Sequence, residues 1–229
     1  HTTVQANGST MQVCVKLKAG RVKGKKRSLY IAMHGGGGCP KQVNDSQYRQ
    51  MQNYWFNNTI EAGGIYVATR GITNSWKLHW ENNSYACYDR IIENAILLND
   101  VDPNRVYLMG YSAGGDGVYR VTPVMPDRFA AVNMCAGHPN GVSVTNFMHV
   151  PTLLQVGECD TAYNRHKIAV QYNQTLQKRR EACGGDGYIS ECRVRDVRVH
   201  RMTHSLEHTL TRTPTGTQSC GTQLYQGSR

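Results

Sequence analysis

The chain has 229 residues, of which 39% are hydrophobic. It can therefore bury the core of one domain but is too short for two domains of typical size. No apolar run approaches the roughly 20 residues of a membrane-spanning helix, and the composition is neither fibrous nor disordered. The formal net charge is +10, with a basic stretch between Lys16 and Arg27. Aromatic residues do not interleave with these charges as a stacking surface requires, so we predict a solvated hairpin and no nucleic-acid partner. The alternative is a patch for an acidic polysaccharide, a membrane surface or nucleic acid. We predict one domain over residues 1–229.

The cysteines and sequons predict a secreted glycoprotein. The 8 cysteines include no C-x-x-C pair, which argues against a zinc ribbon, and their even number predicts disulfides in an oxidising compartment. A short turn-forming segment favours the pair Cys183–Cys192, and two neighbouring strand ends favour Cys135–Cys159. Buried free thiols in a cytosolic enzyme are the alternative. N-x-[S/T] sequons, which mark surface sites in secreted proteins, begin at Asn7, Asn44, Asn57, Asn82 and Asn173.

The predicted elements alternate between strands and helices along the chain. Short apolar runs with β-branched or aromatic members predict strands, and apolar residues three and four apart predict helices. Strands separated by helices imply a mostly parallel sheet covered on both faces. In chain order we expect strands 13–17 and 29–33, helix 42–62, strand 65–69, a helix capped by Ser84, strand 106–109, a further helix, strands 129–134 and 152–156, helix 163–180 and strand 194–200.

A Gly-x-Ser-x-Gly motif follows the predicted strand 106–109 and opens a helix. In that setting the serine sits on a sharp strand-to-helix turn, and Gly110 and Gly114 let the strand and the helix approach closely. The N-terminus of the helix favours negative charge that develops beside it. The motif therefore predicts Ser112 as a nucleophile.

A glycine run, His34-Gly35-Gly36-Gly37-Gly38, directly follows the predicted strand 29–33. Glycines let backbone N–H groups face a substrate oxygen without interference from side chains, and an HGGG segment supplies such a donor in esterases and lipases. A second donor is the N–H group after the nucleophile, on Ala113. A phosphate cradle is the alternative, but no Gly-Lys-[Ser/Thr] follows the run.

An acid and a histidine should complete a catalytic triad, in the order Ser, Asp, His for this motif. Asp160 follows the predicted strand 152–156, at the carboxyl edge of the sheet where ligands bind, and Glu158 is its rival. His204 comes just beyond the last predicted strand, in the loop position that a general base needs. We expect His200 to belong to the strand itself, and His208, four residues after His204, is the other rival histidine.

Other residues that follow predicted strands are candidates to line the site. His138 follows strand 129–134, and Trp76 and Trp80 follow strand 65–69. We expect Trp76 and His138 to contact the substrate, with packing as the alternative role for the tryptophans. A zinc-protease pattern, H-x-x-E-H, also begins at His204, but it needs a further acidic ligand and no Asp or Glu follows residue 208. No metal or organic cofactor is predicted.

Three segments carry a resemblance to a known family. Residues 102–119, 136–140 and 160–165 resemble α/β-hydrolases related to polyhydroxybutyrate depolymerase-like and feruloyl-esterase-like serine esterases, and the similarity runs over about residues 29–207. The resemblance implies the α/β-hydrolase fold. It also implies a triad of Ser112, Asp160 and His204 and an oxyanion hole formed by the amides of Gly36 and Ala113. Family members carry Gly-His-Trp where this chain has Thr203-His204-Ser205.

We therefore predict a serine hydrolase that cleaves a carboxylic ester by acyl transfer. Only about a dozen residues separate the strands that end near Ala136 and begin near Thr152, too few for a large cap domain. An open site suits a bulky or polymeric ester. Two alternatives remain: a peptidase on the same scaffold, and a catalytically inactive binding or structural protein that kept the serine motif.

Overall fold

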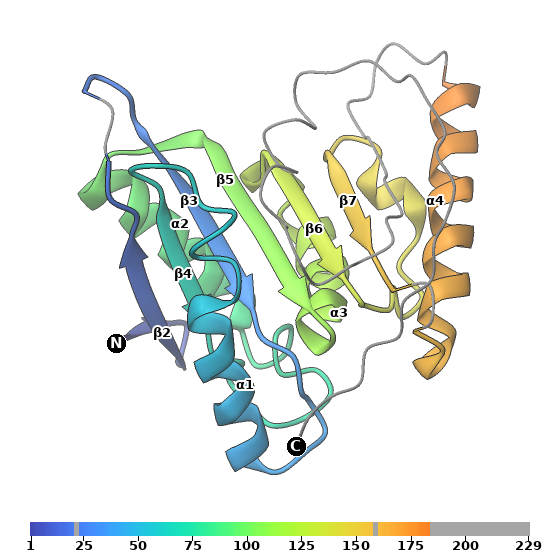
Figure 1. Cartoon of the computed structure of the whole chain (residues 1–229), viewed down its shortest axis with the longest axis horizontal. Coiled ribbons are helices and arrows are strands. Elements are labelled where there is room, and N and C mark those ends of the chain that lie inside the picture. Colours follow the sequence, from blue (N-terminus) through green and yellow to red (C-terminus); the bar gives the residue numbers. More distant parts are fainter. Residues whose placement is uncertain (21–22, 158–159, 184–229) are drawn as a thin grey trace.

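The computed structural model describes residues 1–20, 23–157 and 160–183. Within them, seven strands form one sheet in the order β1-β2-β4-β3-β5-β6-β7. β3, β4, β5, β6 and β7 are mutually parallel, whereas β2 is antiparallel to both β1 and β4 (Figure 1). The strands are β1 (Thr2–Ala6), β2 (Ser9–Leu17), β3 (Arg27–Met33), β4 (Ile65–Thr69), β5 (Val101–Tyr111), β6 (Ala131–Cys135) and β7 (Thr152–Gln155).

Helices cover both faces of this sheet, as predicted. Those longer than one turn are α1 (Lys41–Tyr54), α2 (Ser84–Asn99), α3 (Ala113–Val121) and α4 (Arg165–Ala182), and the largest of the short 3-10 helices is η3 (Val144–Phe147). Side chains of β3 alternate between two cores: Leu29 and Ile31 pack with residues of α2 and α3, whereas Tyr30 packs with residues of α1. Because successive side chains of a strand point to opposite faces, an entirely apolar strand requires this double cover.

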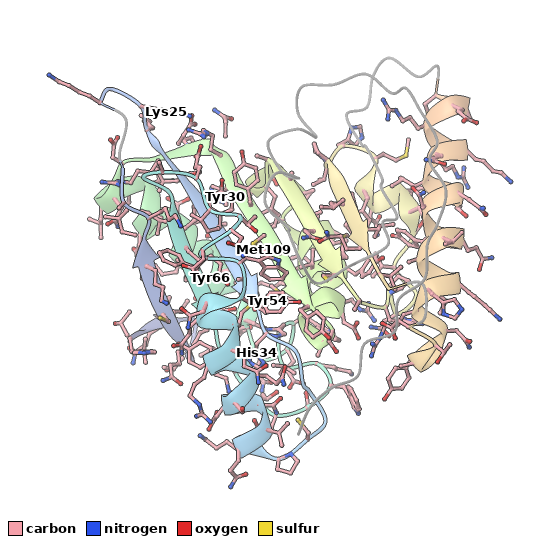
Figure 2. All side chains as sticks on the ribbon, viewed as in Figure 1. Lys25, Tyr30, His34, Tyr54, Tyr66 and Met109 are labelled. Carbon is pink, nitrogen blue, oxygen red and sulfur yellow. The ribbon has the colours of Figure 1, made fainter. Side chains whose placement is uncertain are left out.

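Large aromatic residues pack on the α1 side of the sheet. Tyr30 and Tyr107 stack with ring centroids 4.9 Å apart, and Tyr66 donates a hydrogen bond to the carbonyl oxygen of Met51 in α1 (2.5 Å). Figure 2 shows Tyr30, Tyr66 and Met109 on this face, and His34 beyond the end of β3, where the chain leaves the sheet. The carboxyl edge of the parallel strands is therefore where the glycine run begins.

The basic stretch is not a hairpin, so that prediction is wrong. β4 lies between β2 and β3, so the chain between them crosses over one strand and does not return beside the strand that it left. The hairpin is formed instead by β1, which the sequence did not predict, and β2. Lys16 of β2 and Lys18, just after that strand, both lie over the ring of Phe56, at 5.0 and 5.1 Å from its centroid.

Strand and helix boundaries also differ from those predicted. β5 begins at Val101 and not at residue 106, and β6 covers Ala131–Cys135 and not residues 129–134. The helix expected over residues 42–62 ends at Tyr54, because Asn57, Asn58 and Thr59 hydrogen-bond well in turns and compete with helical pairing. Ser84 is the first residue of α2 rather than its cap, which is Asn83. The helix expected over 163–180 begins at Arg165, since Tyr163 and Asn164 have positive φ values of 55° and 56°. The strand expected over 194–200 lies outside the described residues.

Disulfides are absent among the cysteines that the structure describes. Cys14, Cys39, Cys87, Cys135 and Cys183 are all free thiols. The predicted pairs Cys183–Cys192 and Cys135–Cys159 each have one partner outside the described ranges. The disulfide framework that the even cysteine count predicts is therefore not present within them.

The sequons differ in how the fold exposes them. Asn7, Asn57 and Asn82 are exposed and Asn173 is partly exposed. Asn44 is fully buried, and its amide donates to the carbonyl oxygen of Cys39 (3.3 Å) and to Asn74 Oδ1 (3.1 Å). Asn44 is therefore a structural residue in the folded chain. The described helices are all too short or too polar to span a bilayer.

Candidate active site

Ser112 occupies a strained turn between β5 and α3. Its backbone angles are φ 55° and ψ −119°, a conformation that L-residues rarely adopt. Its N–H donates to the carbonyl oxygen of Cys135 at the end of β6 (2.9 Å), and its own carbonyl accepts from the N–H of Asp116 (3.0 Å). The turn is thus held from the neighbouring strand on one side and from the first turn of α3 on the other.

Close backbone packing explains why the motif has glycines. A Cβ on Gly110 would collide with the carbonyl oxygen of Gly114, and one on Gly114 would lie 2.6 Å from the carbonyl carbon of Met33. A Cβ on Gly115 would lie 2.8 Å from the carbonyl oxygen of Cys135. No Cβ fits at such distances, so β3, β5, β6 and α3 meet at this point only because these residues lack side chains.

The glycine run lies directly against this turn. A Cβ on Gly35 would lie 3.3 Å from the Cβ of Ser112, and one on Gly37 would lie 3.3 Å from the Cβ of Ala113. Gly36 and Gly37 have φ values of 105° and 80°, which glycine adopts without cost. The structure therefore brings together the two segments that the sequence predicted to form the oxyanion hole.

Asn44 of α1 holds the glycine run in place. Its Oδ1 accepts the N–H of Gly37 (2.8 Å), which takes that donor out of use. A Cβ on Gly36 would collide with the same oxygen atom, so only glycine fits there. Within the described residues, no intramolecular acceptor is found for the N–H of Gly36.

Two buried histidines fix the start of the run. The N–H of Gly71 donates to Nε2 of His34 (3.1 Å), so His34 carries its proton on Nδ1, which donates to the carbonyl oxygen of Gly35. Nε2 of His79 lies 2.9 Å from the carbonyl oxygen of His34 and donates to it. Burial lowers the pKa of His34 to about 4 and that of His79 well below its ordinary value. Both rings are therefore neutral structural groups at neutral pH, and His34 is a positioning residue.

A cleft of about 400 Å³ opens beside Ser112. The apolar rings of Trp76 and Trp80, from the segment before α2, line it together with His138, which follows β6. Trp76 is 58% exposed, and its ring meets that of Tyr163 edge-on with centroids 6.4 Å apart. Both residues predicted to contact substrate, Trp76 and His138, thus line the same cleft as Ser112.

Asp116 is a cleft residue that the sequence reasoning missed. Its carboxylate accepts the backbone N–H of His138 (2.7 Å) and the side-chain amide of Asn140 (3.1 Å). Burial raises its pKa, and these two donors partly oppose that rise. The available signal was spacing, because Asp116 lies three residues after Ala113 and so faces the same side of α3.

Asp160 lies in the loop after β7, as predicted, and is paired with Arg165. Its carboxylate is 3.2 Å from the Arg165 guanidinium, which also lies over the ring of Tyr163, 5.2 Å from the centroid. Arg165 lines the cleft. The other predicted members and rivals, His204, His208 and Glu158, lie outside the described residues.

Other cationic side chains in the cleft were also missed. Lys77 and Arg120 line it together with Arg165. Arg120 stands four residues after Asp116, so the face of α3 that begins at Ala113 continues to it. No group of three or more His, Cys, Asp or Glu side chains is placed to hold a metal ion in the part of the chain that the structure describes.

Comparison with known proteins identifies the fold. No protein-family model matches the chain. Over 142 residues it is 25% identical to a poly(3-hydroxybutyrate) depolymerase of Ralstonia pickettii, a match that covers 56% of this chain and 28% of the relative. The chain therefore spans well under half the length of that relative.

Solved structures of a depolymerase and an esterase are similar to this fold. LpqC, a poly(3-hydroxybutyrate) depolymerase of Bordetella parapertussis, has a TM-score of 0.62 at 18% identity and covers 82% of this chain and 78% of its own. A thermostable esterase has a TM-score of 0.57 at 19% identity, covering 84% of this chain and 53% of its own. These neighbours confirm the predicted fold class and the predicted resemblance. This chain has the α/β-hydrolase fold, and its sequence resembles a poly(3-hydroxybutyrate) depolymerase.

Proposed function

We propose that the chain hydrolyses carboxylic esters with Ser112 as the nucleophile. The observation that carries this proposal is the strained backbone of Ser112, at φ 55° and ψ −119°, held against a glycine run at the wall of a cleft of about 400 Å³. Strain of this kind costs about 1–3 kcal/mol and persists where function requires it. The names of the sequence relative and of both solved neighbours, a depolymerase and an esterase, support the same reaction class.

The mechanism is acyl transfer in two steps. The Ser112 hydroxyl attacks the ester carbonyl while His204 takes its proton, and the tetrahedral intermediate collapses as His204 returns that proton to the departing alcohol. Water then attacks the acyl-enzyme by the same route and releases the acid. Asp160 orients the His204 ring and stabilises its positive charge.

Two backbone N–H groups stabilise the oxyanion in this proposal. The N–H of Ala113 is the first of α3, where helix geometry leaves it without an intrahelical partner, and the positive end of the helix dipole adds to it. The N–H of Gly36 is the second, since that of Gly37 is already bonded to Asn44. Each such donor is worth about 3 kcal/mol in the transition state.

Arg165 holds the Asp160 carboxylate beside the cleft in this scheme. The ion pair spans 3.2 Å and both side chains are largely shielded from solvent. A carboxylate bonded on one side by a guanidinium keeps lone pairs free for the N–H of an imidazole. We therefore expect Arg165 and His204 to contact the same carboxylate.

Hydrolysis of a chromogenic ester tests the nucleophile. Purified wild type should cleave 4-nitrophenyl butyrate, and Ser112→Ala should lose at least about a thousandfold in kcat. A fluorophosphonate probe should add one label per wild-type chain and none to Ser112→Ala, as read by intact mass. Equal labelling of both proteins contradicts the proposal and favours the inactive alternative.

A variant series tests the triad. His204→Ala should lower kcat by several orders of magnitude, whereas His208→Ala should cost less than about tenfold. Asp160→Asn should fall near His204→Ala, and Glu158→Gln should stay near wild type. Circular dichroism of each variant separates lost chemistry from unfolding. An inactive His208→Ala beside an active His204→Ala overturns the assignment and calls for metal analysis.

The substrate proposal is a polyester or another bulky ester. The cleft opens beside exposed Trp76, and the sequence relative is named as a poly(3-hydroxybutyrate) depolymerase. Comparing acetyl, butyryl, feruloyl and 3-hydroxyalkanoate esters identifies the acyl preference. A matched aryl ester and aryl amide separate an esterase from a peptidase, and faster cleavage of the amide contradicts the ester assignment.

We also propose that the protein passes through the secretory pathway. Exposed sequons at Asn7, Asn57 and Asn82 support this location, whereas the described cysteines are free thiols and add no support. Glycopeptide mapping of the protein expressed with a signal peptide in a eukaryotic host should find glycans at exposed sequons and none at buried Asn44. A protein that carries no glycan at any of its sequons contradicts the proposal.

A further inference from the structure

The cleft beside Ser112 has a positively charged wall. Lys77, Arg120 and Arg165 line it, and among the described residues Asp116 supplies the only carboxylate of the lining. Arg165 is neutralised by its ion pair with Asp160. In the described part of the chain, neither Lys77 nor Arg120 forms an ion pair, so two positive charges in the cleft lack a partner.

Arg120 has an additional unsatisfied group. Its Nε atom is buried and has no hydrogen-bond partner among the described residues, although the side chain as a whole is partly exposed to the cleft. Nε itself is closed to a ligand in the cleft, which can bond only to the terminal nitrogens of the guanidinium. Asp116, four residues earlier on α3, does not satisfy it, since that carboxylate is bonded to His138 and Asn140.

The position of Arg120 sets a distance from the nucleophile. Ala113 and Arg120 lie seven residues apart on one face of α3, which is about 10 Å along the helix axis at 1.5 Å per residue. Trp76 and Trp80 supply apolar wall within the same cleft. A ligand that reaches from Ser112 to Arg120 is therefore several bonds long and can be apolar in its middle.

We propose that the cleft selects esters that carry a carboxylate at the far end of an apolar chain, with Arg120 as the residue that binds this carboxylate. This inference rests on the proposed ester hydrolysis and adds the substrate class to it. Arg suits the role because its planar guanidinium binds a carboxylate through two parallel hydrogen bonds. Lys77 adds a second positive charge that attracts an anion to the cleft.

The alternative role for Arg120 is packing between α2 and α3. Its charge acts on Tyr85 of α2, where it partly opposes the rise in pKa that burial causes. A packing role needs the hydrocarbon stem of Arg120 and not its charge. Arg120→Gln and Arg120→Lys therefore separate the two roles, because both retain much of the stem and only the second retains the charge.

Matched substrates test the proposal. The probes are mono-4-nitrophenyl esters of adipic, suberic and sebacic acid, each compared with the ester in which the free acid is a neutral carboxamide. Wild type should prefer the acid by about tenfold in kcat/KM at one chain length, and this preference should fall with added salt. Arg120→Gln should bring the acid-to-amide ratio near one, and Arg120→Lys should retain part of it.

Control variants distinguish the possible failures. Arg90→Gln removes the same charge from an exposed position on α2 outside the cleft and should keep the wild-type ratio. Ser112→Ala measures spontaneous hydrolysis, and thermal unfolding checks that each variant folds. A Ser112-dependent enzyme with equal rates on acid and amide overturns the carboxylate site and leaves the proposed function standing.

A direct binding measurement covers the case in which no ester is cleaved. Absence of Ser112-dependent hydrolysis contradicts the proposed function alone. Suberate and suberamide are then titrated against the protein, with the fluorescence of cleft tryptophans as the signal. Tighter binding of suberate that Arg120→Gln abolishes supports the anion site, and equal binding of the two overturns it.

Discussion

His79 donates a hydrogen bond from Nε2 to the carbonyl oxygen of His34, 2.9 Å away, so one buried histidine holds the backbone of another. The rings lie with centroids 4.9 Å apart, and His34 in turn accepts the N–H of Gly71. This pair ties the start of the glycine run to the segment before α2. The His34 ring must stay neutral to keep these bonds, since protonated His34 could not accept from Gly71.

We predict that acid destabilises the fold through this pair. Burial lowers the folded pKa of His34 from 6.5 to about 4, so between these values the unfolded chain binds a proton that the folded chain does not. The stabilisation is complete above pH 6.5 and is lost as the pH falls towards 4. His34 alone contributes about 3 kcal/mol over this interval. Urea unfolding at pH 7.5, 6 and 5 measures the loss.

His79→Leu should reveal the same pH dependence of stability. The variant leaves the carbonyl oxygen of His34 without its donor and should lose about 1–3 kcal/mol at pH 7.5. The difference in the free energy of unfolding between wild type and variant should become smaller towards pH 5. The reason is that the variant has one buried histidine fewer to protonate on unfolding. Ile92→Val, a buried substitution without a titrating group, should differ from wild type by the same free energy of unfolding at every pH. A gap for His79→Leu that is equally wide at both pH values contradicts the prediction.

Ser112→Gly should be more stable than Ser112→Ala by about 1 kcal/mol. Both variants remove the hydroxyl, but only glycine adopts φ 55° without steric cost. At Ser46, inside α1, the order should reverse, because glycine is the poorer helix former by about 1 kcal/mol. Thermal and urea unfolding of the four variants measures both differences. Equal stability of the two Ser112 variants would show that the turn is unstrained.

Gly114→Ala should destabilise the protein by about 3 kcal/mol or more. The added Cβ would lie 2.6 Å from the carbonyl carbon of Met33, which is backbone of a central strand and cannot move aside. Gly157→Ala is the matched control, because its Cβ would be 3.8 Å from the nearest atom outside its chain neighbours. The soluble fraction and the midpoint of urea unfolding are measured for both variants. Wild-type stability of Gly114→Ala would mean that β3 and α3 do not approach as closely as described.

Asn44→Ala should impair both stability and turnover. It leaves the buried N–H of Gly37 without its acceptor, which costs about 1–3 kcal/mol, and it frees the glycine run beside Ser112. We expect kcat to fall more than KM rises, since a misplaced oxyanion donor acts on the transition state. Asn58→Ala, at an exposed position, should leave both quantities near wild type. A lowered stability with unchanged kcat restricts Asn44 to a purely structural role.

Local sequence was sufficient for the turn at Ser112 and most of the sheet. The Gly-x-Ser-x-Gly and HGGG motifs act through backbone conformation, and the glycines at 36, 110 and 114 prove to be places where no Cβ fits. The apolar strands were found for a similar reason, because a strand buried on both faces has few polar residues. The predicted strand 65–69 coincides with β4 (Ile65–Thr69).

Long-range pairing could not be obtained from the sequence. The position of β4 between β2 and β3 depends on which strands share hydrogen bonds across the sheet, and a local pattern carries no information about partners. The same holds for burial. Asn44 reads as a glycosylation site in sequence, and only tertiary packing shows that its amide is buried and bonded to Cys39 and Asn74.

The composition of the cleft was likewise decided by tertiary structure. Sequence spacing places Asp116 and Arg120 on one face of α3, but that face could equally have been solvated or packed. The fold places it beside Trp76, from the segment before α2, and Arg165, at the start of α4. The charge of a site is a sum over residues distant in sequence. The sequence therefore determined the turn at Ser112, and the tertiary structure decided what surrounds it.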